Sequence, residues 1–152
     1  MLETEEGQSN AIFALFGSAA QRAQNFENGV GKFLIIYNRI TSETLTTEDL
    51  ESRNANLHKK TTGQLLHRLK KIVTFADDTY TDYFQEALDQ RNFLMHKYFL
   101  ERDHVFATEE SRFSALQELT QMEAVFDRAR IAINAMRIAL CRTLDLDPGE
   151  NA

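Results

Sequence analysis

The sequence predicts an all-α protein, a four-helix bundle with one short extra helix. Over several long segments apolar residues recur at steps of three and four, which is the period of one face of an α-helix. The one proline among the 152 residues, Pro148, follows the last of these segments, so no proline interrupts them. No stretch alternates apolar and polar residues as a half-buried strand does. We therefore expect one helical domain over residues 9–145, with a disordered tail over 1–8 and a C-terminal tail over 146–152.

The first predicted helix runs from about Asn10 to Ile40. Its apolar positions fall on one stripe, which includes Ile12, Leu15, Phe26, Val30, Phe33 and Tyr37. A loop follows, and Thr47 opens the short extra helix near Leu50. Acidic residues stand in the first turn of this helix, where the helix dipole favours negative charge.

Three further helices follow. Thr61 and Gln64 match a capping box, in which each side chain satisfies a backbone N–H of the other, and this predicts a helix that ends near Ala76. The next predicted helix covers about Tyr80–Glu101. The last and longest begins at Thr108 and continues to the C-terminal tail, with a buried side that includes Phe113, Leu119, Phe126, Ile133 and Leu140.

Charge is unevenly distributed along the chain. The formal net charge is −6, which argues against binding of nucleic acid by the whole surface. Between Ser52 and Ala76, however, there is no acidic residue, and the basic residues there include Lys59, Lys60, Arg68, Lys70 and Lys71. This segment is either a solvated helix face beside acidic neighbours or a surface that binds RNA phosphates. We keep both interpretations.

Cysteine content and the N-terminus indicate a cytoplasmic protein. The single cysteine, Cys141, lies in an apolar run and has no partner for an intramolecular disulfide, so we expect a buried thiol in a reducing compartment. The first residues are acidic where a signal peptide would be basic. The longest apolar run is too short to cross a bilayer, so we expect no membrane association.

Two polar features stand inside the helix predicted for residues 80–101. Arg91 falls on the apolar stripe, and a guanidinium there requires a partner because an unpaired buried charge costs several kcal/mol. Asn92 and His96 are four positions apart and therefore share a helix face beside that stripe. Together they suggest a polar cleft in a seam between helices, although a structural network bracing a helix crossing or a dimer explains the same residues.

These residues resemble the RX4-6H signature of the HEPN superfamily, in which a polar residue follows the arginine directly. Arg91, Asn92 and His96 match it, and Tyr98 extends the match to the RX4HXY form of toxins that pair with a minimal nucleotidyltransferase. The resemblance implies a homodimeric, metal-independent endoribonuclease, a toxin or defence effector, with two motifs meeting across a shared cleft. His96 would take a proton from a ribose 2′-OH, Arg91 would stabilise the phosphate, and Asn92 would orient either His96 or the phosphate.

The resemblance also implies a partner. A nucleotidyltransferase-type antitoxin would modify Tyr98 with a nucleotide, whereas the simpler interpretation of Tyr98 is a core aromatic with its hydroxyl at the edge. The alternative for the whole chain is a non-catalytic HEPN-like helical dimer that acts as a binding or scaffold protein. We expect no cofactor and no metal, because Glu101 and His104 form only half of a di-iron pattern and no second copy follows.

Overall fold

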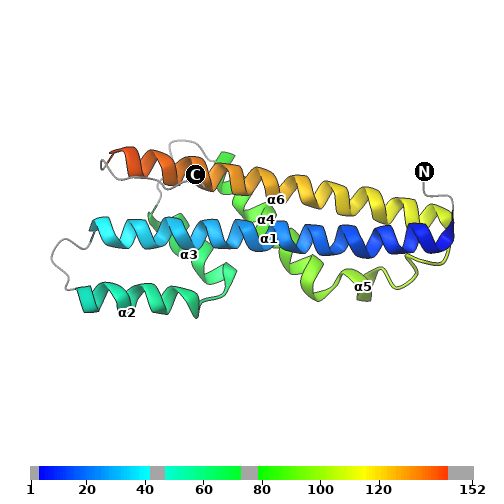
Figure 1. Ribbon diagram of the computed structural model, residues 1–152, viewed down its shortest axis with the longest axis horizontal. Helices are drawn as coiled ribbons and strands as arrows, with labels where there is room; N and C mark the ends of the chain where they lie inside the picture. Colours follow the sequence, from blue (N-terminus) through cyan, green and yellow to red (C-terminus); the bar gives the residue numbers. More distant parts are fainter. Residues whose placement is uncertain (1–3, 42–46, 73–78, 144–152) are drawn as a thin grey trace.

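The computed structural model describes residues 4–41, 47–72 and 79–143, and every regular element in these ranges is an α-helix (Figure 1). The all-α prediction is confirmed for this part of the chain. The elements are α1 (Glu5–Thr41), α2 (Thr47–His58), α3 (Thr62–Ile72), α4 (Thr79–His96), α5 (Tyr98–Glu101) and α6 (Glu109–Thr143).

The two longest helices, α1 and α6, lie side by side and run in the same direction (Figure 1). Their contacts join residues that are 104 or 105 positions apart: Arg112 with Gln8, Arg22 with Asp127, and Ile133 with Gly29. A constant separation is the mark of a parallel pair. With 37 and 35 residues, each helix extends for about 50 Å.

α4 packs against both long helices and runs antiparallel to them. Phe84 near its start stacks on Phe26, whereas Tyr98, just after its end, meets Phe16 in the first half of α1. Side chains from these three helices, joined by residues of α3 and α5, form one core. Its fully buried large members include Ile12, Phe26, Val30, Leu34, Phe84, Leu94, Tyr98, Leu119, Phe126 and Ile133.

α2 and α3 flank the second half of α1 (Figure 1). Arg68 on α3 donates a hydrogen bond to Oδ1 of the buried Asn38, and Lys70 donates to Oε1 of Gln85 on α4. Three helices therefore share the core along its length, and the two shorter ones close one end. The predicted end of α3 near Ala76 lies outside the described residues, as does the predicted tail over 146–152.

Side-chain hydrogen bonds cap the N-termini of α3 and α6. Thr61 and Gln64 exchange hydrogen bonds at 3.0 and 3.3 Å, which confirms the capping box of α3. At α6, Thr108 and Ser111 exchange the equivalent pair at 3.0 Å each. These motifs depend on neighbouring residues only, so sequence identifies them directly.

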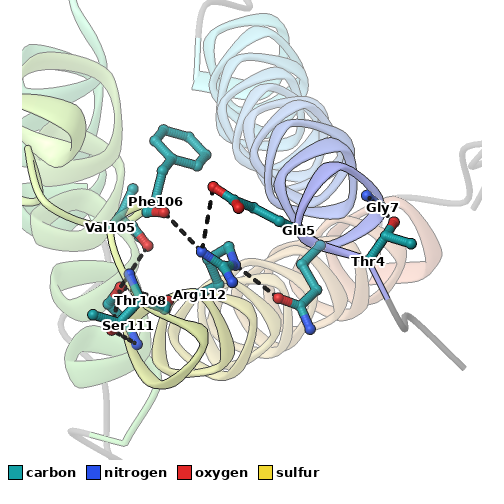
Figure 2. Close-up of polar contacts among 9 residues, drawn as sticks. Thr4, Glu5, Gly7, Val105, Phe106, Thr108, Ser111 and Arg112 are labelled. Carbon is teal, nitrogen blue, oxygen red and sulfur yellow. Dashed lines mark hydrogen bonds and ion pairs between the residues drawn. The ribbon is translucent and has the colours of Figure 1, made fainter.

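A buried arginine near the start of α6 links that helix to the start of α1. Arg112, 7% exposed, donates from Nε to Oε1 of Gln8 at 2.7 Å and from Nη1 to the Phe106 carbonyl at 2.8 Å, and Glu5 lies 3.9 Å away. Figure 2 shows its guanidinium between the start of α1 and the segment after α5. α1 begins at Glu5, where the Thr4 hydroxyl accepts a hydrogen bond from the Gly7 N–H (Figure 2), so the helix starts inside the segment that we expected to be a disordered tail.

The helix predicted over residues 80–101 is interrupted. α4 ends at His96, Lys97 adopts φ −129° and ψ −18°, and α5 resumes at Tyr98. At this break the aromatic rings of Phe13, Phe16, Phe93 and Phe106 pack around Tyr98 and Phe99. In the described residues no helix is both long and apolar enough to cross a membrane.

Candidate functional site

Arg91 lies at the seam between α4 and α1 and is paired across it. Its Nε donates to Oε1 of Glu27 at 2.6 Å, and the two side chains are 26% and 24% exposed. The sequence requires a partner for this guanidinium, and the partner comes from the same chain. Glu27 is a residue that the sequence analysis did not identify, and it stands next to the core residue Phe26 on the edge of the α1 stripe.

Asn92 and His96 are both exposed on α4. Oδ1 of Asn92 accepts a hydrogen bond from Nη1 of Arg91 at 3.2 Å, so the amide helps to hold the guanidinium. His96 occupies the last position of α4, and its side chain forms no hydrogen bond or ion pair with other described residues. Five helical positions separate it from Arg91, which turns the two side chains about 140° apart.

Within one chain the motif is therefore only partly assembled. Arg91 and Asn92 are in contact, and Asn92 shares a face with His96 one turn further on. No contact joins His96 to Arg91 in the described structure. Leu94, inside the motif, is in the core, so the polar residues of the motif are at the surface and its central apolar residue faces inward.

Tyr98 is in a different environment from the rest of the motif. It is 1% exposed and lies among the rings of Phe16, Phe93 and Phe99. Its hydroxyl is buried without a hydrogen-bond partner in the part of the chain that is described. Burial raises the pKa of Tyr98 to about 12, the charge of Glu118 adds to this effect, and Arg102 opposes it.

The predicted RNA-binding residues are divided by the fold. Lys60, Arg68 and Lys71 line one hollow of about 460 Å³ on α3, which we call the α3 hollow, together with Gly63, Gln64 and His67. Lys70 points instead toward α4, where it donates to Gln85. Lys59 is exposed but does not line the hollow. Three of the five predicted residues are thus brought together.

A second hollow of about 460 Å³, the α1 hollow, adjoins the motif. Its lining includes Glu27, Lys32 and Leu65, and Lys60 belongs to both hollows. Lys32 was not among the predicted residues, because it is an isolated lysine on α1 and its proximity to the basic segment arises only in the fold. In the described residues no group of three or more His, Cys, Asp or Glu side chains is placed to hold a metal ion.

Comparisons of this chain with protein-family models, with curated proteins and with solved structures found no match.

Proposed function

We propose that this chain is a metal-independent endoribonuclease of the HEPN type that acts as a toxin or defence effector. The observation that supports the proposal best is the surface position of the motif. Asn92 and His96 are exposed, and Arg91 is held by two partners yet remains a quarter exposed. A purely structural arginine on an apolar stripe would need no exposed histidine and amide beside it.

The proposed reaction is an internal transfer at phosphorus. Neutral His96 takes the proton of a ribose 2′-OH, whose oxygen attacks the adjacent phosphorus. The bond to the 5′ oxygen of the next nucleotide breaks, and that oxygen takes a proton from water while protonated His96 returns its own proton to solvent, so the products end in a 2′,3′-cyclic phosphate and a 5′-OH. Arg91 stabilises the charge on the phosphoryl oxygens, and Asn92 orients the guanidinium.

A homodimer is part of the proposal. Because Arg91 and His96 point in directions about 140° apart on the same helix, one copy alone does not direct both side chains at one phosphate. A second copy, related by two-fold symmetry, would supply the missing group to each site.

Restraint by a nucleotidyltransferase-type antitoxin that modifies Tyr98 also belongs to the proposal. Because the phenol of Tyr98 is 1% exposed, α5 would have to leave the core before the transferase could reach it.

One observation favours a second candidate function. The ion pair with Glu27 satisfies Arg91 within the chain, as a purely structural arginine would require. A non-catalytic helical dimer that acts as a binding or scaffold protein would use the pair in this way. In the ribonuclease, by contrast, substrate phosphate must compete with Glu27 for the guanidinium.

A gel assay on mixed cellular RNA tests the two candidates. Wild type should cleave RNA in the presence of a chelator and leave an all-deoxy substrate intact, since the nucleophile is the 2′-OH. His96→Ala and Arg91→Ala should each lose activity by about 100-fold or more. His104→Ala is the matched control, because the His104 side chain is exposed and its one hydrogen-bond partner among the described residues is Asp103.

Three outcomes decide between the candidates. Cleavage by His96→Ala at the wild-type rate would remove His96 as the base. A dimeric wild type that leaves RNA intact would favour the scaffold. A monomer at micromolar concentration in light scattering would reject both candidates, since each requires the dimer.

A further inference from the structure

The α3 hollow and the α1 hollow meet at a shared residue, Lys60. At one end of the pair, Lys71 lies near the C-terminus of α3. At the other end, Glu27 lines the α1 hollow and is the residue that holds Arg91. The two hollows therefore connect the basic face of α3 with the guanidinium of the motif.

The charges of the two hollows suit a chain of anions. Lys60, Arg68 and Lys71 line the α3 hollow, and among the described residues no acidic side chain does. Lys32 and Lys60 line the α1 hollow, whose one acidic residue, Glu27, is already paired with Arg91. A negatively charged strand would thus meet cations along the whole path on a protein that is otherwise acidic.

We propose that the two hollows form one track for the phosphate backbone of single-stranded RNA, with Lys32 as a contact that leads the strand to Arg91. α3 has 11 residues and so extends for about 16 Å, a length that spans several nucleotides. Phosphates occur once per nucleotide along an extended strand, which matches cations spread along a line better than a compact acidic peptide does. This inference rests on the proposed function and identifies how its substrate is held.

The track separates the predicted basic residues into two sets that differ in place but not in charge. Lys60 and Lys71 line the track, whereas Lys59 and Lys70 do not. Reversing either pair to glutamate changes the net charge by the same amount. A general electrostatic attraction would respond equally to both changes, and a track would not.

Fluorescence anisotropy with a labelled 2′-O-methyl RNA measures binding alone, because the blocked 2′ oxygen cannot attack. Lys60→Glu/Lys71→Glu should weaken binding by about tenfold or more, and Lys59→Glu/Lys70→Glu by clearly less. Lys32→Gln should also weaken binding. Each lost phosphate contact should reduce the slope of log affinity against log salt by about 0.7. Thermal unfolding of each variant checks that the fold persists.

The outcomes separate the track from the catalytic proposal. Equal losses in the two charge-reversed pairs, or an unaltered affinity in Lys32→Gln, would overturn the track. Competition by poly-glutamate as effective as that by RNA would show that the surface takes acidic protein, and would overturn it too. Tight, track-dependent binding by a protein that does not cleave ordinary RNA would support the track and reject only the ribonuclease.

Discussion

Arg91 on α4 and Glu27 on α1 form an ion pair across 2.6 Å, although 64 positions separate them in the chain. The pair joins the helix that carries the candidate motif to the longest helix of the core. It also fixes the guanidinium beside Asn92. The same contact therefore has two consequences, one for the stability of the α1–α4 seam and one for the availability of Arg91 to a phosphate.

We predict that Arg91 and Glu27 are energetically coupled. Arg91→Ala and Glu27→Gln should each lower the free energy of unfolding by about 1 kcal/mol, because each leaves a partly buried polar group without its partner. The double variant should lose less than the sum, with a coupling of about 0.5–1 kcal/mol in urea unfolding. The exposed pair Arg128–Glu86, with both side chains 45% exposed, is the control and should couple more weakly.

Glu27→Gln also bears on function. If Glu27 competes with phosphate for Arg91, this variant should bind 2′-O-methyl RNA more tightly than wild type, by about threefold, the equivalent of roughly 0.7 kcal/mol. Arg91→Ala should bind it more weakly. Unchanged affinity in both variants would mean that Arg91 does not meet the substrate.

Two glycines of α1 should respond to alanine in opposite directions. A Cβ at Gly29 would lie 2.8 Å from Cγ2 of Ile133, where α1 and α6 approach each other closely, whereas nothing lies within 4 Å of one at Gly17. Gly29→Ala should therefore destabilise by about 1–3 kcal/mol. Gly17→Ala should stabilise by about 0.5–1 kcal/mol, because alanine favours the helix. Thermal unfolding of both variants measures these changes. A Gly29→Ala variant more stable than wild type would contradict the close approach of α1 and α6.

Arg112 should be essential for the start of the bundle. Arg112→Met keeps most of the side-chain volume but removes the donor to Gln8 and to the Phe106 carbonyl. Each acceptor left without its donor costs about 1–3 kcal/mol, so we expect a loss of about 2–4 kcal/mol. Arg130→Met, at a side chain 38% exposed with one partner at 3.9 Å, should cost under about 0.5 kcal/mol. Similar losses in both would show that the Arg112 contacts contribute little.

The sequence predicts the helices well because their signals are local. The capping box of Thr61 and Gln64 and the start of α6 after Thr108 both follow from residues within one turn. The start of α1 was placed too late because two contacts were not anticipated: the Thr4 hydroxyl accepts a hydrogen bond from the Gly7 N–H, and the Gln8 side chain binds Arg112, which is 104 residues away. The break at Lys97 was missed for a similar reason, since aromatic rings from α1 and from the segment after α5 pack around it.

The candidate site could be predicted only in part. Sequence identifies Arg91 as a charge that requires a partner, but the identity of Glu27 depends on which face of α1 meets α4. The simpler interpretation of Tyr98, a core aromatic with its hydroxyl at the edge, is right for the ring, but the hydroxyl is buried as well because α5 packs it among other aromatic rings. Likewise, a run of basic residues along the chain does not reveal that Lys70 turns toward Gln85 while Lys60 faces two hollows.

The last prediction concerns Tyr98 and alkaline pH. Burial raises its pKa to about 12 in the folded protein, above the ordinary value of 10.0. Below pH 10 the phenol is neutral in both the folded and unfolded states, so its contribution to stability is constant. As the pH rises from 10 to 12, the unfolded chain releases the proton and the folded one retains it, so the folded state loses stability by up to about 1.4 kcal/mol per pH unit.

Tyr98→Phe isolates this effect, because every other titrating group is common to both proteins. The difference in unfolding free energy between wild type and Tyr98→Phe should be constant from pH 7 to 9 and then move against wild type above pH 10. At pH 7 the variant should be as stable as wild type or more so, since the buried hydroxyl has no hydrogen-bond partner among the described residues. Parallel stability curves up to pH 11.5 would mean that the phenol reaches water, and that a transferase could modify it without moving α5.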